Sequence, residues 1–390
     1  DMRLQKLAGL ERKKIEEELR EVQALIAELK TILGSKKKML TIIKTELAEV
    51  AEKFGDDRRT KIVKGGVKML SAEDLVADEE SVLVLTQGGY VKRTNPSEYR
   101  TQKRGGVGVV DLNTKEEDVV TKLLTTSSHS DLLFFTDKGK VYQCKMYEIP
   151  EGRRATKGKS IMNFLALTSE EKVTSVIAVR KEGWEGDWSL MMVTKNGVVK
   201  KSDASSFKDV RRSGLIAITL HAEDALIAAH FVGAGDEVSL ITSKGQSIRF
   251  KESDVREMGR TAAGVSGMKL GKGDIIVSAD VLSKDSKDSE ILVVMENGYG
   301  KTSPTKEYKV QKRAGSGIKT AKITSKTGNV IGGAVIDAEG RGEGELVVMS
   351  KKGQVIKLPL KDVPCLGRQT QGVRVMKLRP GDSIASIVYF

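Results

Sequence analysis

The chain has 390 residues, of which 39% are hydrophobic and 31% are charged, and its apolar runs are too short to cross a bilayer, so no membrane partner is expected. Its two cysteines, Cys144 and Cys365, lie far apart without a nearby cysteine or histidine, which excludes a zinc site or a disulfide framework and fits a reducing cytoplasm. The formal net charge is +13, most of it after residue 60, which indicates a polyanionic partner.

Residues 1–60 are predicted to be helical. Apolar residues recur three or four positions apart from Leu4 to Leu33, and a second stripe of the same spacing runs from Leu40 to Phe54. The pair Gly34-Ser35 separates the two helices. Neither stripe has enough local partners to be covered. The segment therefore forms either a hairpin that caps the next domain or, as we favour, one arm of a coiled coil in a longer polypeptide.

Residues 61–390 change to short β-prone segments that repeat six times. Each repeat begins with an apolar strand, a turn that contains glycine and a second strand, because glycine supplies the positive φ that a tight hairpin turn requires. The turn glycines are Gly89, Gly139, Gly197, Gly245, Gly298 and Gly353. A later glycine opens a third strand in each repeat: Gly106, Gly158, Gly214, Gly264, Gly317 and Gly372.

A unit of this size cannot bury both faces of its own sheet, so the repeats must stack on one another. The sequence therefore predicts an all-β domain over residues 61–390 with six propeller-like blades, preceded by the helical segment of residues 1–60. A closed ring and an open spiral of the same blades both satisfy the repeat pattern.

Positive charge falls at two equivalent places in the repeats. One set lies in the loop before the third-strand glycine: Lys103, Arg104, Arg153, Arg154, Lys157, Arg211, Arg212, Arg256, Arg260, Lys312, Arg313 and Arg368. The other set lies on the second strand: Lys92, Arg93, Lys200, Lys201, Arg249, Lys251, Lys301 and Lys357. Because equivalent loops of a propeller share one rim, a positive belt around the domain is predicted.

Such a belt suits duplex DNA. Bending about 40 bp through a half-turn costs roughly 10 kcal/mol, which only many phosphate contacts along a curved track can offset. Aromatic residues amount to 4% of the chain, which makes base stacking on a single strand a poor fit. The predicted contacts are therefore to the duplex backbone, with little sequence preference and a steep dependence on salt.

The first repeat contains a basic, glycine-rich heptapeptide made of Gln102, Lys103, Arg104, Gly105, Gly106, Val107 and Gly108. Its glycines let backbone amides approach phosphates, and Lys103 and Arg104 neutralise them. The heptapeptide resembles the one that distinguishes DNA gyrase A subunits from topoisomerase IV. The segments 3–11, 32–35, 54–60 and 254–264 are also similar to that family, so the resemblance covers essentially the whole chain.

The resemblance implies a β-pinwheel, in which neighbouring blades exchange strands and duplex DNA is wrapped on the outer rim. It implies that residues 1–60 are the end of the dimer gate and the returning coiled-coil helix. The expected partners are double-stranded DNA, a second gyrase A chain and gyrase B, in the cytoplasm and on the nucleoid. ATP and Mg²⁺ would bind other regions of the holoenzyme, an ATP-dependent type IIA topoisomerase, and no cofactor or metal is expected here.

The resemblance also places the DNA-cleaving tyrosine upstream of residue 1, so no catalytic residue is expected in this chain. Position six of the heptapeptide is Val107, where the family usually has Lys or Arg, which shifts phosphate capture toward Lys103 and Arg104. A similar septet runs from Gln311 to Gly317 in the fifth repeat. The acidic tail of some family members is not expected to regulate wrapping here, because the sequence ends with Val388-Tyr389-Phe390.

Two other classes of function compete with this interpretation. The first is a topoisomerase IV-type C-terminal domain, which would relax or decatenate DNA; the heptapeptide and the count of six repeats argue against it. The second is a protein-interaction propeller, which predicts no shared placement of the basic clusters. A catalytic propeller is disfavoured because His129, His221 and His230 do not recur at equivalent positions.

Overall fold

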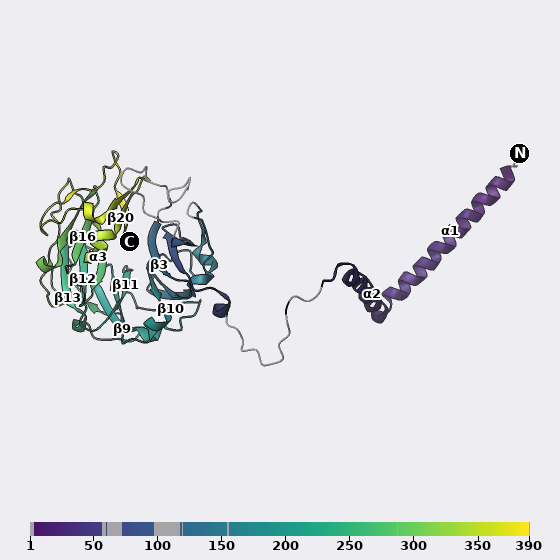
Figure 1. Cartoon of the computed structure of the whole chain (residues 1–390), viewed down its shortest axis with the longest axis horizontal. Coiled ribbons are helices and arrows are strands. Elements are labelled where there is room, and N and C mark those ends of the chain that lie inside the picture. The colour runs from purple at the N-terminus through teal and green to yellow at the C-terminus, as the bar shows by residue number, and fades with distance from the viewer. Residues whose placement is uncertain are drawn as a thin grey trace. The chain divides into compact units, whose positions relative to one another are not determined.

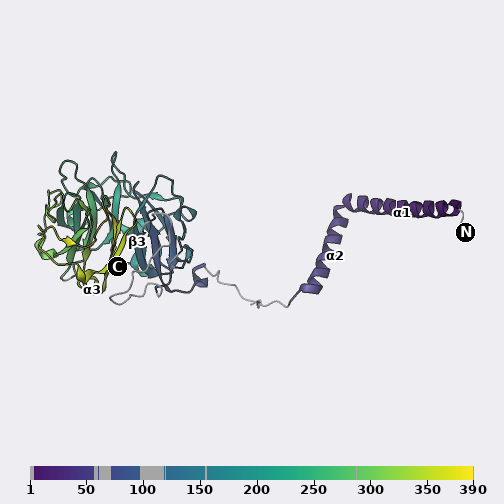
Figure 2. The same ribbon diagram turned by 90° about the horizontal axis from the view of Figure 1, so that it is seen from above.

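The structure is a computed structural model that describes residues 4–56, 60, 72–96, 118, 120–153, 156–286 and 288–389. The chain divides into two compact units, residues 1–69 and residues 70–390. The sequence placed the boundary slightly earlier, at residue 60. The two units are described separately below, first the helical unit and then the β-sheet unit (Figures 1 and 2).

The first unit consists of α1 (Leu4–Leu33) and α2 (Lys36–Phe54), so the predicted pair of helices and the break between them are confirmed. The apolar stripe of each helix is exposed: Leu19 is 55% exposed, Leu47 is 63% exposed and Phe54 is 78% exposed. No residue of α2 is buried. The coiled-coil role of these helices stays a prediction.

The second unit is a ring of six antiparallel sheets, here called blades 1 to 6 in chain order (Figure 1). Each blade contains a central hairpin and an inner strand, and five of them gain a two-residue strand at the outer edge in the described part of the chain. Blade 1 contains β1 (Glu80–Thr86), β2 (Tyr90–Thr94), β3 (Val120–Ser127) and β6 (Lys159–Ser160). Blade 2 contains β4 (Asp131–Thr136), β5 (Lys140–Lys145), β7 (Val173–Val179) and β10 (Leu215–Ile216). Blade 3 contains β8 (Ser189–Thr194), β9 (Val198–Asp203), β11 (Leu226–Val232) and β14 (Val265–Ser266).

The remaining blades repeat the same plan. Blade 4 contains β12 (Glu237–Thr242), β13 (Gln246–Lys251), β15 (Ile276–Leu282) and β18 (Ile318–Lys319). Blade 5 contains β16 (Glu290–Met295), β17 (Tyr299–Pro304), β19 (Val330–Ile336) and β22 (Val373–Arg374). Blade 6 contains β20 (Glu345–Ser350), β21 (Val355–Pro359) and β23 (Ile384–Tyr389), and α3 (Ala338–Glu343) precedes it. The short 3-10 helices are η1 (Ala72–Leu75), η3 (Met146–Glu148), η4 (Ile161–Asn163), η5 (Lys181–Trp184), η6 (Ala204–Phe207), η7 (Glu252–Asp254), η8 (Thr305–Glu307) and η9 (Leu360–Asp362).

The outermost strand of a blade comes from the next repeat along the chain. After the hairpin of blade 2, for example, the chain crosses to blade 1, where β6 pairs with β2, and only then returns as the inner strand β7. The glycine before each crossing strand has a positive φ, and a Cβ at Gly158 would lie 2.5 Å from the carbonyl oxygen of Val91. The predicted third-strand glycine therefore opens an exchanged strand, as expected for a pinwheel, and the inner strand follows later.

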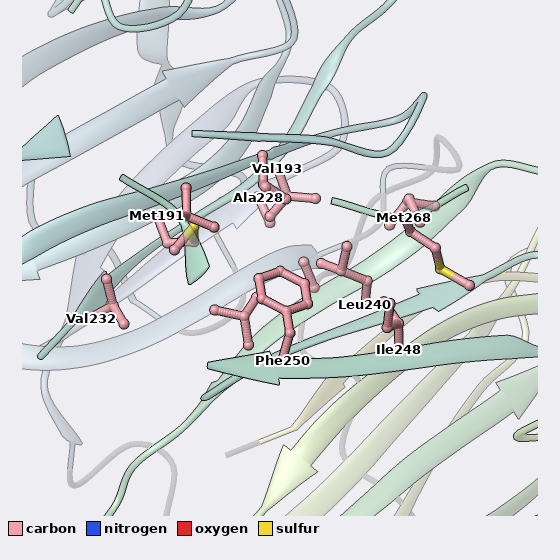
Figure 3. Packing of buried hydrophobic residues seen from close by; sticks show 13 residues of the cluster. Met191, Val193, Ala228, Val232, Leu240, Ile248, Phe250 and Met268 are labelled. Carbon is pink, nitrogen blue, oxygen red and sulfur yellow. The ribbon is translucent and has the colours of Figure 1, made fainter. Parts of the chain in front are cut away.

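The hydrophobic core lies between neighbouring blades. Between blades 3 and 4, Met191 and Val193 of β8 pack with Leu240 of β12 and with Phe250 of β13 (Figure 3). Equivalent clusters of buried side chains join blades 1 and 2, 2 and 3, 4 and 5, and 5 and 6. Burial of apolar surface between sheets is therefore the main force that holds the repeats together.

The ring closes between the last blade and the first. The inner strand β23 lies beside β3, and Met349 and Val388 of blade 6 pack with Val120 and Leu123 of blade 1. The other inner strands lie beside one another in the same way, in the order β3, β7, β11, β15, β19 and β23. The repeat pattern allowed a closed ring or an open spiral, and the structure is the closed ring.

Candidate nucleic-acid interface

The basic loops lie at the outer edge of the ring because each one leads into an exchanged strand. The strands β6, β10, β14, β18 and β22 pair with β2, β5, β9, β13 and β17, which are the outer strands of the hairpins. In blade 1, Arg93 also forms a parallel bridge with Glu151 at the start of the loop from blade 2. The described loops of repeats 2 to 6 therefore run along the rim, each beside the preceding blade.

The side chains of these loops are mostly accessible to solvent. Arg153, Arg211 and Arg260 are exposed, and so is Arg256. The Lys312 side chain is 92% exposed and its Nζ lies 3.3 Å from a carboxylate oxygen of Asp254. Accessible guanidinium and ammonium groups on one edge form a surface that can pair with phosphate oxygens.

Other loop side chains also hold the rim together. Arg212 is exposed and pairs with Glu148 at 2.6 Å, and the Lys157 ammonium lies 4.0 Å from the centre of the Tyr90 ring. Arg313 donates to the carbonyl oxygens of Asp254 and Ser266, both at 2.9 Å. Arg368 donates to the carbonyl oxygen of Lys319 at 2.8 Å. The guanidinium groups of Arg313 and Arg368 therefore fix their loops to the exchanged strands β14 and β18, and that of Arg212 is held by η3.

Backbone hydrogen bonds link each rim segment to the next. The segment that follows an exchanged strand donates to the basic loop of the following repeat, from Thr219 to Ala262, from Lys269 to Gly315 and from Lys322 to Thr370, over 2.9 to 3.3 Å. Neighbouring loops are therefore consecutive along one track.

The sequence interpretation missed three cations on that track. Lys269, Lys322 and Lys377 are exposed and each stands five residues after the third-strand glycine of its repeat. The same spacing was available in the sequence, but it occurs in repeats 4 to 6 only; Asp111, Asn163 and Thr219 occupy the position in repeats 1 to 3.

Three lysines of the second strands are buried, which contradicts the prediction that they contact phosphates. Lys92 is 1% exposed and Lys200 and Lys301 are 0% exposed. Burial lowers the pKa of Lys200 to about 8, and the neighbouring charge of Arg260 contributes to the shift. Burial also lowers the pKa of Lys301 to about 8, although Glu307 opposes the shift. A side chain inside the protein does not reach a phosphate, so the prediction is wrong for these three residues.

The other strand cations are engaged with carboxylates or packed in the sheet. Lys201 pairs with Glu252 at 2.6 Å and Lys357 pairs with Glu345 at 2.5 Å. Arg249 pairs with Glu237 and donates to the carbonyl oxygen of Thr305 at 2.8 Å. Arg93 is half-buried, whereas Lys251 and Lys357 are exposed. Most strand cations therefore stabilise the sheets, and most of the rim charge that faces solvent comes from the loops.

The heptapeptide residues Gln102, Lys103, Arg104, Gly105, Gly106 and Gly108 lie outside the described residues, and so does Arg154. The roles assigned to them stay predictions.

Within the described residues there is no cluster of three or more His, Cys, Asp or Glu side chains that could hold a metal ion. No helix of the described part of the chain is long and apolar enough to cross a membrane. Both cysteines are unpaired: Cys144 is buried and Cys365 is exposed.

A ring of six sheets, five of which receive an outer strand from the next repeat in the described residues, has basic loops along its outer edge. This arrangement defines the class of the second unit, a β-propeller of the pinwheel kind. A family model described as DNA gyrase C-terminal domain, beta-propeller, matches one blade after another over residues 80–127, 130–180, 189–232, 236–283, 289–337 and 344–389. The chain therefore belongs to the DNA gyrase A C-terminal domain family, as the heptapeptide resemblance indicated.

Comparisons with individual proteins agree. The chain is 43% identical over 387 residues to the DNA gyrase A protein of Staphylococcus epidermidis, and 43% identical to that of Staphylococcus aureus strain Mu50. It spans 43% of the length of these relatives and 99% of its own length is covered. Among solved structures, a DNA gyrase A C-terminal domain matches with a TM-score of 0.66 at 27% identity, covering 80% of this chain and all of that chain (100%). A DNA topoisomerase IV C-terminal domain matches with a TM-score of 0.65 at 27% identity, covering 80% and 94%.

Proposed function

We propose that the ring binds duplex DNA along its basic rim and bends it, as the C-terminal wrapping domain of a gyrase A protein. One observation supports this most strongly: the basic loops of successive repeats lie on one edge and are joined end to end by hydrogen bonds. The exposed cations therefore follow a curve. A stiff duplex gains phosphate contacts on a curved track only by bending with it.

The energetics favour many weak contacts over a few strong ones. Bending about 40 bp through a half-turn costs roughly 10 kcal/mol, so on the order of a dozen phosphate contacts must share the cost. The described loops supply exposed arginines, and Lys269, Lys322 and Lys377 add further cations beside them. These contacts read no base sequence, which suits a domain that wraps any duplex.

In the complete enzyme, the wrapped segment would be presented to the strand-passage machinery with a positive crossover, so that passage introduces negative supercoils. We place ATP and Mg²⁺ in regions of the holoenzyme outside this chain, together with the DNA-cleaving tyrosine. The proposed partners are duplex DNA, gyrase B and a second gyrase A chain, in an assembly of two A and two B subunits in the cytoplasm, on the nucleoid.

The fold itself does not separate this function from that of topoisomerase IV, since the TM-scores for the two kinds of solved domain are 0.66 and 0.65. What favours gyrase is the heptapeptide of residues 102–108 and the similarity to gyrase A proteins along nearly the whole chain.

A topology assay tests wrapping directly. Nicked circular DNA is incubated with the chain, ligated and freed of protein, and its change in linking number is measured at low and high salt. We expect a positive shift that grows with protein concentration and disappears at high salt, because the contacts are ionic. A linking number that stays unchanged at low salt contradicts wrapping.

A second experiment separates gyrase from topoisomerase IV. Lys103→Ala with Arg104→Ala in the full-length protein is expected to abolish ATP-dependent supercoiling and to spare relaxation and decatenation. The matched control is Lys181→Ala with Lys284→Ala, which removes two exposed charges that follow the inner strands β7 and β15. Supercoiling that survives the first pair of substitutions refutes the role of the heptapeptide.

A further inference from the structure

The third residue after the turn glycine alternates in character around the ring. It is Lys92 in blade 1, Lys200 in blade 3 and Lys301 in blade 5. In the even-numbered blades the same position is occupied by Tyr142, Ile248 and Ile356. The three lysines are the buried cations described above, and we call them the support lysines.

Each support lysine holds the rim loop of the following repeat from beneath. Lys92 donates to the carbonyl oxygens of Arg153 at 3.3 Å and Thr156 at 3.0 Å. Lys200 donates to the carbonyl oxygen of Arg260, and also to that of Ala217 at 2.6 Å. Lys301 donates to the carbonyl oxygens of Gly367 at 2.7 Å and Arg368 at 2.5 Å. In all three blades, one acceptor is the backbone of a rim arginine.

In blades 2 and 4 the equivalent side chains support the rim loop with apolar atoms instead. The Tyr142 ring packs under Gly214 so closely that a Cβ there would lie 2.5 Å from Cε1. The Cδ1 atom of Ile248 lies 3.4 Å from the position of a Cβ on Gly315. Such contacts fill space without direction, whereas an ammonium donates to specific oxygens and fixes the backbone that carries them.

Burying an ammonium among carbonyl groups is costly, so a lysine at this position needs a specific structural reason. For Lys200 and Lys301 the neighbouring charges are those of Arg260 and of Glu307 and Arg368, and no carboxylate is within salt-bridge distance of either ammonium in the described residues. The hydrogen bonds to the loop carbonyls are therefore the main compensation for burial.

We propose that Lys92, Lys200 and Lys301 are positioning residues for DNA wrapping: they fix the loops of repeats 2, 4 and 6 so that Arg153, Arg260 and Arg368 present their guanidinium groups to phosphates. The inference rests on the proposed wrapping function. It assigns the support lysines no contact with DNA, and it makes the rim alternate between loops that are held by ammonium groups and loops that rest on apolar side chains.

The test replaces each support lysine by methionine, which keeps the length of the side chain and removes the donor. Binding of a 40 bp duplex by the 390-residue chain is measured across a range of salt concentrations, well below the melting temperature of every variant. We expect the triple variant to lower the slope of log affinity against log salt by about 3, which is roughly 0.9 for each of three lost phosphate contacts. The matched control Ile248→Met, at the equivalent position of blade 4, is expected to keep the slope of the wild type.

Hydrogen exchange supplies a readout that needs no stable triple variant. In the wild type, the amides of Thr156, Ala262 and Thr370 in the held loops should exchange more slowly than that of Gly214, and Lys200→Met alone should speed exchange at Ala262. The inference is overturned if the triple variant binds DNA with the same salt slope as a wild type whose binding depends on salt. It is also overturned if the amides of the two kinds of loop exchange at the same rate. A wild type without salt-dependent DNA binding refutes the wrapping function instead, and exchange at Ala262 then still reports whether Lys200 holds its loop.

Discussion

The outer rim and the inner strands of the ring use charge in opposite ways. On the rim, cations such as Arg153, Arg211 and Lys269 stand exposed. Along the inner strands, a carboxylate is instead held by neighbouring blades: Asp280 of β15 accepts hydrogen bonds from the Val335 amide of β19 at 2.8 Å and from the Tyr389 hydroxyl of β23 at 3.3 Å.

Lys122 and His230 lie near Asp280 and Tyr389, and we call these four residues the inner cluster. Lys122 of β3 is accessible to solvent, yet the desolvation imposed by the surrounding strands lowers its pKa, and the charge of Asp280 opposes that shift. Asp280 therefore links blade 4 to blade 5 and to blade 6, and its charge reaches Lys122 of blade 1. Charge that is compensated inside the ring stabilises its closure, whereas uncompensated charge outside is available to a ligand.

The largest expected effect separates the two regions by salt. DNA affinity of the chain should fall by about a millionfold between about 50 and 200 mM salt, because on the order of a dozen rim contacts release condensed counterions. Over the same range the free energy of unfolding should change by less than about 1 kcal/mol, because the burial of apolar surface between the blades holds the ring together. Fluorescence anisotropy with a labelled duplex and urea titrations measure the two quantities. DNA affinity that is insensitive to salt would remove the rim from the interface.

Asp280→Ala should damage the ring without damaging the rim. It leaves the Val335 amide and the Tyr389 hydroxyl without their acceptor, so the free energy of unfolding should drop by about 2 kcal/mol. The exposed Asp187, changed to alanine, is the matched control and should cost less than about 0.5 kcal/mol. Urea titration followed by tryptophan fluorescence gives both values. Equal stabilities of the two variants would show that the inner cluster does not stabilise the ring.

Arg153→Ala with Arg256→Ala should weaken DNA binding without lowering the stability of the ring. Both side chains are exposed on the rim, so their loss should weaken DNA binding about tenfold and lower the salt slope by about 2, with unfolding energies unchanged within about 0.5 kcal/mol. The control pair Lys181→Ala with Lys284→Ala removes the same charge beyond the inner strands and should leave the slope alone. Identical losses from both pairs would mean that net charge, and not the rim, sets the affinity.

The sequence predicted the parts of this contrast that repeat. The turn glycines and the hydrophobic strands recur in every unit, and each turn glycine has the positive φ expected of it, from 75° at Gly139 to 82° at Gly197. The sequence did not predict that loop cations are exposed whereas most strand cations are buried or paired. The charge of a strand lysine does not show whether its Nζ is buried or reaches solvent. The alternation of Lys92, Lys200 and Lys301 with Tyr142 and Ile248 was the available signal, since apolar residues at an equivalent position indicate a buried one.

The sequence could not predict that the ring closes, for a different reason. Met349 and Val388 are ordinary apolar residues of β-strands, and nothing in their spacing says that the neighbour of β23 is β3. The inner cluster was hidden likewise, since Lys122, His230 and Asp280 come from different repeats and occupy no repeated position. Contacts between unlike positions of a repeat depend on the rotation from blade to blade, which the repeat pattern does not encode.

The smallest expected effect concerns acid and the inner cluster. Burial lowers the pKa of His230 below its ordinary value, while Asp280 opposes the shift and Lys122 adds to it; Nε2 donates to the Ala279 carbonyl at 2.9 Å. The unfolded chain therefore binds a proton more readily than the ring does, so stability is full above about pH 6.5 and declines as the pH falls below it, by at most about 1.4 kcal/mol per pH unit. His230→Gln keeps a donor at this position and should flatten the decline between about pH 6.5 and 5.5. The exposed His221, changed to glutamine, is the control, and urea titrations at each pH give the slopes. A decline that His230→Gln leaves unchanged would assign the acid sensitivity to carboxylates elsewhere and would confine the role of the inner cluster to Asp280 and its partners.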